Sequence, residues 1–143
     1  MTRIDKPTDH LIGAAKLASK LAHVHVSDYK VGAALLMDSG KLHIGYNIET
    51  DVHTLTVHAE VLSVINFLQR DDLFDKPKAL CVYVRGEKAW FPCGICRQYI
   101  WEKCGDITII ACCDSNVETK YAKLSKIFPD GFRKGKQNER KTK

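Results

Sequence analysis

The sequence has no long apolar run, no internal repeat and no net charge over most of its length. No hydrophobic stretch reaches the roughly 18 residues that a membrane-spanning helix needs. The first ten residues, MTRIDKPTDH, are polar and lack the apolar core of an export signal. Charged residues make up 27% and hydrophobic residues 45% of the 143 residues, which is typical of a soluble globular protein. These features predict one soluble domain without a membrane span.

The formal net charge of +5 is confined to the end of the chain. The last eleven residues, RKGKQNERKTK, hold six Lys or Arg and one Glu, which leaves 16 basic and 16 acidic residues in 1–132. We expect residues 1–132 to form the globular domain and residues 133–143 to be a basic, disordered tail. A neutral body continues no basic surface beyond the tail, so we expect no more than weak tail contacts with nucleic acid.

The six cysteines are expected to be free thiols. Without a signal for export, they indicate a reducing compartment, and we expect the protein to be cytoplasmic. Cys81, Cys104, Cys112 and Cys113 are expected to serve as small buried hydrophobes.

Hydrophobic periodicity predicts helices that alternate with strands. Helical spacing covers about 9–22, 58–70 and 94–105, buried-strand runs cover 79–86 and 106–113, and a short helix is expected over 123–128. The turn signal at 38–40 separates two further strand-like runs, 30–37 and 41–47, as a hairpin. This order predicts an α/β fold, a three-layer α/β/α sandwich with a mixed central sheet.

Two cysteines lie three residues apart in the stretch FPCGICRQ, where a helix is predicted to start. This spacing places the sulfurs of Cys93 and Cys96 on one side of a first helical turn, within reach of one ion. A helix N-terminus also favours the thiolate form. Taken alone, the pair is equally suited to a redox disulfide or to half of a zinc site.

The stretch His58-Ala59-Glu60 begins the preceding predicted helix and can supply the other half. If the two helix N-termini face each other, His58, Cys93 and Cys96 give zinc three protein ligands. A fourth position left for water is what distinguishes a catalytic zinc from a structural one. Glu60 would then be an unbound carboxylate beside that water.

The pattern H-x-E followed by P-C-x-x-C is the known signature of zinc deaminases. The chain further resembles the cytidine deaminase family, in its small single-domain form, through YKVGAALL at 29–36, GYNIE at 45–49, HAE, PCGICRQ and FPDGF at 128–132. The resemblance runs from the first predicted helix to Phe132. It implies hydrolysis of cytidine or deoxycytidine to uridine or deoxyuridine and ammonia in pyrimidine salvage, with one zinc per chain.

The resemblance also implies roles for individual residues. Glu60 would shuttle protons, and the Ala59 backbone N–H would hold the carbonyl of the base. Asn47 and Glu49 would bind the ribose hydroxyls, and Tyr29 would flank the ring. Phe132 would reach a neighbouring subunit's nucleoside in a homotetramer. We expect Trp90 and Phe91 to be packing residues, and His23-Val24-His25 to be a loop.

Four positions depart from the usual family pattern. His58 stands where the small enzymes commonly have a third Cys, and Val61 stands where an Arg commonly follows the Glu. The two changes fit together, because zinc with two thiolates and a neutral imidazole is already neutral. Tyr29 replaces the usual Phe, and His53 replaces a Tyr that reaches toward a neighbouring subunit.

Three other functions remain open at this stage. Deaminases of nucleoside analogues such as blasticidin S resemble the chain at SDY and also lack the Arg, but they are not expected to have the pair Asn47 and Glu49. A deaminase acting on polynucleotides is suggested only by the tail. An inactive zinc-binding relative is disfavoured by the presence of Glu60.

Overall fold

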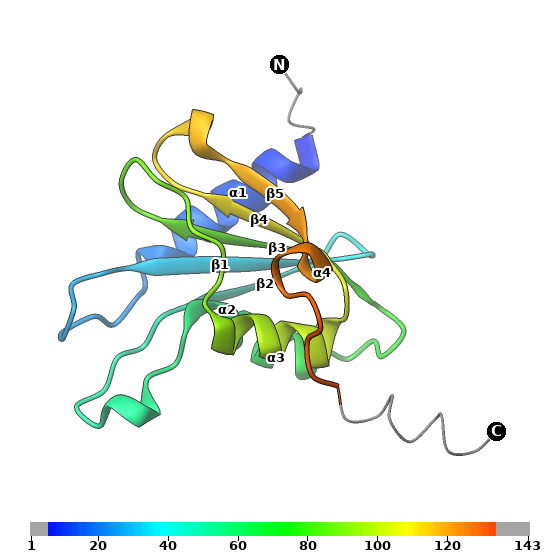
Figure 1. Ribbon diagram of the computed structural model, residues 1–143, viewed down its shortest axis with the longest axis horizontal. Coiled ribbons are helices and arrows are strands. Elements are labelled where there is room, and N and C mark those ends of the chain that lie inside the picture. Colours follow the sequence, from blue (N-terminus) through cyan, green and yellow to red (C-terminus); the bar gives the residue numbers. More distant parts are fainter. Residues whose placement is uncertain (1–5, 134–143) are drawn as a thin grey trace.

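The computed structural model describes residues 6–133, which form a single sheet with helices on both faces (Figure 1). The helices and strands, in chain order, are α1 (Lys6–Ser19), β1 (Val31–Met37), β2 (Leu42–Tyr46), the short 3-10 helix η1 (His53–Leu55), α2 (Ala59–Leu68), β3 (Pro77–Val84), α3 (Gly94–Cys104), β4 (Thr108–Cys112), the 3-10 helix η2 (Asn116–Glu118), β5 (Lys120–Lys123) and α4 (Leu124–Ile127).

The five strands pair in the order β2-β1-β3-β4-β5, and the sheet is mixed as predicted. Strand β1 is antiparallel to both β2 and β3, β3 is parallel to β4, and β5 closes the edge antiparallel to β4. From Ala79 onward, β3 is buried on both faces, which explains why its sequence reads as an unbroken apolar run.

Alternate residues of the strands face two separate halves of the core, because successive side chains point to opposite faces. Leu35, Leu80 and Val82 belong to the half beneath α2 and α3. Ala34 and Cys81 belong to the half beneath α1. Figure 1 shows α1 on one face of the sheet and α2 and α3 on the other, so the predicted three layers are confirmed.

Helix α2 rests directly on the backbone of β2 at Gly45. A Cβ atom at this position would lie 2.1 Å from the Ala59 carbonyl oxygen and 2.4 Å from the Ser63 nitrogen, so only glycine permits this contact. Further along the helix, Asn66 donates from Nδ2 to the Ile44 carbonyl oxygen at 2.8 Å. The first turn of α2 is therefore held in place by backbone, not by flexible side chains.

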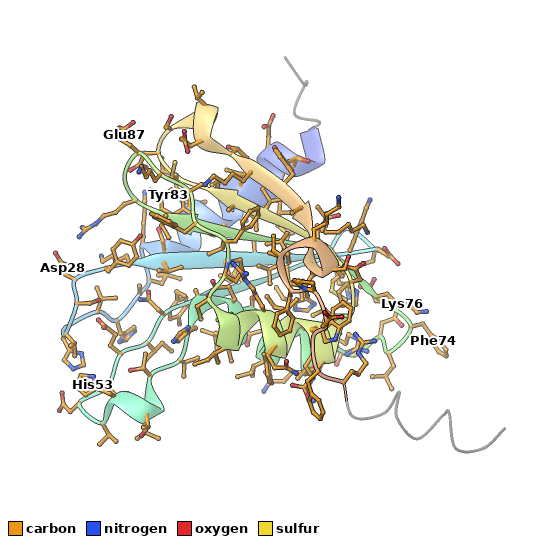
Figure 2. The ribbon with its side chains drawn as sticks, in the orientation of Figure 1. Asp28, His53, Phe74, Lys76, Tyr83 and Glu87 are labelled. Carbon is orange, nitrogen blue, oxygen red and sulfur yellow. The ribbon has the colours of Figure 1, made fainter. Side chains whose placement is uncertain are left out.

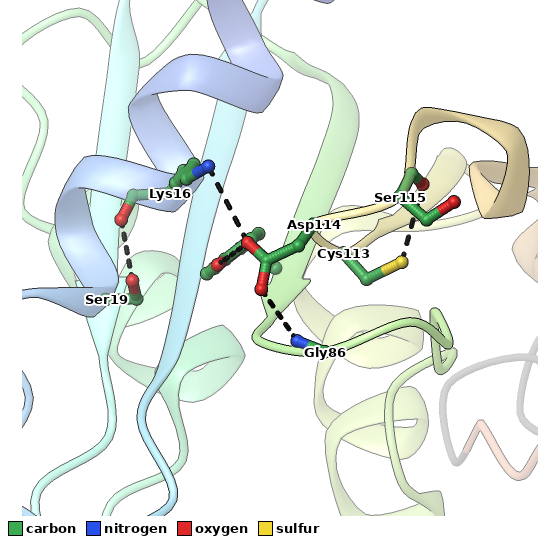
Figure 3. Close-up of polar contacts among 7 residues, drawn as sticks. Lys16, Ser19, Gly86, Cys113, Asp114 and Ser115 are labelled. Carbon is green, nitrogen blue, oxygen red and sulfur yellow. Dashed lines mark hydrogen bonds and ion pairs between the residues drawn. The ribbon is translucent and has the colours of Figure 1, made fainter.

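A polar cluster fixes the ends of the parallel strands to α1 (Figure 3). The Tyr83 hydroxyl donates to Asp114 at 2.6 Å, the Gly86 N–H donates to the same carboxylate at 2.8 Å, and Lys16 approaches it to 3.6 Å. The Gly86 N–H, followed by the Tyr83 hydroxyl, holds the pKa of Asp114 below its usual value. Burial, followed by the bond to Asp114, raises the pKa of Tyr83.

The structure shifts the predicted boundaries, most of all for the first helix, and adds a strand. The first helix was predicted over 9–22 but runs from Lys6 to Ser19, and strand β5 was not predicted at all. Within residues 6–133 no helix has the length and apolar character needed to cross a membrane. The predicted tail lies outside the described residues except for Arg133, which donates to the Trp101 carbonyl oxygen at 2.7 Å.

Candidate active site

The N-termini of α2 and α3 face each other and bring three metal-binding side chains together. His58 and Cys93 are the extended residues just before the two helices, and Cys96 lies in the first turn of α3. The Nδ1 atom of His58 lies 3.4 Å from the Cys93 sulfur and 3.3 Å from the Cys96 sulfur. The convergence expected from the sequence is therefore present.

This donor set fits a zinc ion. With zinc about 2.3 Å from sulfur and about 2.0 Å from nitrogen, tetrahedral ligand atoms stand about 3.5 Å apart, close to the observed separations of 3.3 and 3.4 Å. Within the part of the chain that the structure describes, it is the only such gathering of three metal-binding side chains, with all ligand atoms within 4.8 Å of one another. Soft thiolates combined with imidazole are typical zinc ligands.

Glu60 lies beside this donor set and is 6% exposed. The Cys96 sulfur approaches its Oε2 atom to 3.6 Å. Burial raises the pKa of Glu60, an effect that its own backbone N–H and His58 oppose. Burial also raises the pKa of the Cys96 thiol, and the Glu60 carboxylate adds to this shift. A bound Zn²⁺ would reverse the preference at Cys96, because it deprotonates a coordinating thiol.

A cavity of about 570 Å³ opens over His58, Cys93 and Glu60. It is of the size usual for small-molecule sites. Its lining includes most of the residues predicted from the sequence, namely Tyr29, Asn47, Glu49, His58, Ala59, Glu60 and Cys93. The structure thus gathers residues from four separate stretches of the chain at one site.

Asn47 and Glu49 lie in the cavity wall and also bind the loop before β1. Asn47 accepts from the Val31 N–H at 2.9 Å and donates to the Tyr29 carbonyl oxygen at 2.8 Å. Glu49 accepts from both the N–H and the hydroxyl of Ser27, each at 3.1 Å. These two side chains therefore shape the cavity, whatever they also bind.

Comparison with known proteins identifies the family. Residues 6–113 match the model described as the cytidine and deoxycytidylate deaminase zinc-binding region. The chain belongs to this deaminase family. It is 32% identical over 126 residues to a cytidine deaminase of Sporosarcina psychrophila, covering 88% of this chain and 91% of that one. It is 34% identical over 122 residues to a cytidine deaminase of Mycobacterium tuberculosis, covering 85% of this chain and 86% of that one.

The fold agrees with solved structures of deaminases. The crystal structure of cytidine deaminase from Burkholderia pseudomallei superposes with a TM-score of 0.81 at 28% identity, covering 87% of this chain and 98% of that chain. That of the Mycobacterium tuberculosis enzyme superposes with a TM-score of 0.72 at 30% identity, covering 90% and 99%. The family assignment decides between the two meanings of the CxxC motif, because this deaminase domain binds zinc.

Of the two aromatic residues expected to be packing residues in this deaminase, Phe91 does pack against the hydrophobic core, whereas the expectation was wrong for the exposed Trp90. Trp90 and Phe91 both line the cavity, and Trp90 is 58% exposed. Lys120 lies over the Trp90 ring, 5.9 Å from its centre, and donates to the Ala89 carbonyl oxygen. The sequence could have indicated that Trp90 and Phe91 line the site, because they come directly before Pro92 and Cys93 of the CxxC motif.

Phe132 lies outside the cavity of its own chain in this deaminase. Its side chain is 59% exposed, and its carbonyl oxygen accepts a hydrogen bond from Gln98 at 2.9 Å. His53 is also exposed, in η1, and lines a second hollow of about 510 Å³, which shares Thr56 and His58 with the first cavity. Figure 2 shows His53 at the same end of the molecule as Asp28.

Three of the four other cysteines are buried as expected. All six cysteines are free; Cys81, Cys112 and Cys113 are buried, whereas Cys104 is only partly buried. His23 stacks on Tyr46 with ring centres 6.2 Å apart, and His25 pairs with Asp51 at 2.9 Å. The two histidines are thus loop residues with partners of their own.

Proposed function

We propose that this chain is a cytidine deaminase that converts cytidine and deoxycytidine to uridine and deoxyuridine with release of ammonia. The observation that carries the proposal is the position of Glu60, a buried carboxylate beside a three-donor zinc site at the end of a nucleoside-sized cavity. His58, Cys93 and Cys96 would hold one zinc per chain. The named relatives with cytidine deaminase activity support the choice of substrate.

The chemistry follows from these residues. Zinc, when bound, lowers the pKa of a water molecule from 15.7 toward about 7. Glu60 would take one proton from that water and deliver it to ring N3 as the water oxygen bonds to C4. Glu60 would then take the second proton from the hydroxyl now on C4 and give it to the amine, so that the C4–N bond breaks, ammonia leaves and the C4–O bond becomes the carbonyl of the product. Val61 suits this centre, because two thiolates and a neutral His58 already balance the charge of the ion.

The remaining cavity residues bind the nucleoside. The backbone N–H of Ala59, at the start of α2, can donate to the base carbonyl, since the first N–H groups of a helix have no partner within it. Tyr29 flanks the ring. Glu49 accepts from a sugar hydroxyl, and the Asn47 amide can accept from or donate to one. Each of these residues lines the cavity, which is what such roles require.

An ultraviolet assay on a panel of cytosine nucleosides, with zinc analysis, tests the proposal directly. We expect cytidine and deoxycytidine to be converted by protein that holds about one zinc per chain. Blasticidin S converted faster than both would favour an analogue deaminase instead. Protein that binds zinc but converts nothing on the panel would mean an inactive relative.

We further propose that the protein is a homotetramer in which Phe132 contacts a neighbouring subunit's nucleoside. Its exposure of 59%, outside the cavity of its own chain, supports this. Replacing Phe132 with Ala should raise KM for cytidine severalfold and leave the zinc content unchanged. Light scattering gives the oligomeric state. A monomer with full activity would contradict this proposal.

We propose that the protein acts in the cytoplasm, in pyrimidine salvage. Six free thiols suit a reducing compartment.

We also propose that the basic tail is dispensable for catalysis. A chain ending at Arg133, which keeps the contact with Trp101, should deaminate cytidine at close to the full-length rate. Neither form should convert C to U in single-stranded DNA or RNA, as sequencing after incubation would reveal. Conversion by the full-length chain alone would favour a polynucleotide deaminase.

A further inference from the structure

Ser27 is the centre of a hydrogen-bonded turn at the edge of the cavity. Its N–H and its hydroxyl both donate to the same oxygen of Glu49, Oε1, at 3.1 Å. The Ser27 hydroxyl oxygen in turn accepts from the Tyr29 N–H at 3.0 Å. One exposed side chain thus joins two residues of the cavity wall, although it is not part of the cavity lining itself.

The backbone around Ser27 is shaped to make these bonds. Asp28 has a φ of +56°, in the left-handed region that turns the chain back on itself. Arg85, just beyond β3, approaches the Asp28 carboxylate to 3.7 Å. From the other side, Asn47 bridges Tyr29 and Val31. The loop is therefore held at both ends, and its conformation is coupled to that of Asn47 and Glu49.

The bonds from Ser27 also fix the charge and the orientation of Glu49. Desolvation acts to raise the pKa of Glu49, but the N–H and hydroxyl of Ser27, together with the Val26 N–H and His25, hold this pKa below its usual value. Both bonds end on Oε1, so neither uses Oε2. A carboxylate held at one oxygen by two donors presents the other oxygen in a defined direction.

We propose that Ser27 is a positioning residue that sets sugar recognition by fixing the Glu49 carboxylate. This inference rests on the proposed function, in which Glu49 binds a sugar hydroxyl. The Ser27 hydroxyl does not touch the nucleoside. The Ser27 hydroxyl also accepts from the backbone N–H of Tyr29, but its bond to the Glu49 carboxylate is the one that acts on the sugar. Its removal therefore lowers kcat/KM mainly for substrates that carry a hydroxyl for Glu49 to bind.

The test is the zinc-loaded, full-length Ser27→Ala variant, assayed on cytidine and on 2′,3′-dideoxycytidine. Hydrogen bonds to charged groups of this kind change equilibria by about tenfold or more. We therefore expect kcat/KM for cytidine to fall by about tenfold, mainly through KM. We expect kcat/KM for 2′,3′-dideoxycytidine to change by less than about twofold. Ser27→Thr keeps a hydroxyl and should restore most of the activity on cytidine.

A matched control residue, Ser39, lies at the opposite end of the molecule. Ser39 makes the same kinds of bond, because its N–H donates to Asp75 Oδ1 at 3.0 Å, its hydroxyl donates to Oδ2 at 2.5 Å, and its oxygen accepts from the Lys41 N–H at 3.2 Å. Figure 2 shows Phe74 and Lys76, the neighbours of Asp75, at the end of the molecule opposite to Asp28. Ser39→Ala removes the same kinds of bond and should leave both kcat/KM values within about twofold of wild type.

The outcomes separate this inference from the proposed function. The wild-type chain should prefer cytidine to 2′,3′-dideoxycytidine by about 100-fold or more. If it does, and Ser27→Ala lowers kcat/KM equally for both substrates or for neither, the proposed role of Ser27 is wrong while the proposed function stands. If the wild-type chain deaminates both equally well, the sugar contact of Glu49 is wrong and the role of Ser27 falls with it. Thermal unfolding of each variant shows whether a loss on both substrates comes from a damaged fold.

Discussion

Replacing Glu60 with Gln is expected to lower kcat on cytidine by more than about 10⁴-fold while the protein keeps about one zinc per chain. A single general acid or base contributes about 10² to 10⁴-fold, and Glu60 serves several proton transfers in the proposed reaction. Gln has nearly the same size and can accept a hydrogen bond, but it cannot take up and return a proton. Zinc should stay bound, because His58, Cys93 and Cys96 are unchanged.

Steady-state rates and metal analysis on the same preparation decide this prediction. Glu102→Gln is a suitable control, because it makes the same substitution at an exposed position of α3 and should leave both quantities unchanged. Loss of zinc together with activity would show that Glu60 mainly supports the metal site. Activity that survives without Glu60 would refute the proposed proton transfers.

The second large effect concerns the sugar. Free cytosine should be a poorer substrate than cytidine by about 10⁴-fold in kcat/KM, because a site built to hydrogen-bond a hydroxyl leaves its own polar groups unpaired when that hydroxyl is missing. In the proposed function these groups belong to Asn47 and Glu49, which line the cavity. Both compounds present the same base to Glu60, so the comparison isolates the sugar end.

The measurement is kcat/KM for both compounds by ultraviolet absorbance, at matched zinc loading. Replacing Glu49 with Gln should narrow the difference, since it removes the charge that accepts from the hydroxyl. Equal values for cytosine and cytidine in the wild-type chain would show that Asn47 and Glu49 serve only to hold the loop before β1.

The chemical end of the site could be predicted from the sequence because its residues lie in short motifs at helix starts. His58 and Glu60 are two apart, and Cys93 and Cys96 are three apart, so local backbone geometry nearly fixes their relations. The two helix starts face each other only in the tertiary structure. A zinc site nevertheless requires this arrangement, since three ligands must share one ion. The convergence was therefore predictable from chemistry before any fold was known.

The sugar end of the site was less accessible to sequence reasoning. Ser27, Asn47 and Glu49 interact through a loop that turns at Asp28 with positive φ, and no local pattern shows which donors and acceptors such a loop pairs. Trp90 was taken for a packing residue because large aromatic residues are usually buried. Trp90 is instead exposed because it lines the cavity, and only the tertiary structure shows where that cavity lies.

The fold itself was predictable where the hydrophobic pattern was strong and missed where it was weak. Strands β3 and β4 are buried apolar runs and were found, whereas β5 has an exposed Lys at each end. As an edge strand it pairs on one side only and carries the charged residues that discourage pairing with other chains. Helix α1 starts earlier than predicted, since Pro7 is tolerated in the first turn of a helix.

The seating of α2 on Gly45 has a consequence for how this enzyme can change over time. Because backbone packs on backbone there, Gly45 cannot be replaced without moving the first turn of α2, which carries Ala59 and Glu60. The opposite wall is made of loops and of exposed side chains such as Tyr29 and Trp90, which can be replaced without moving α2. Substrate range can therefore diverge, by natural selection or in the laboratory, at the loop wall while the deamination chemistry is inherited intact.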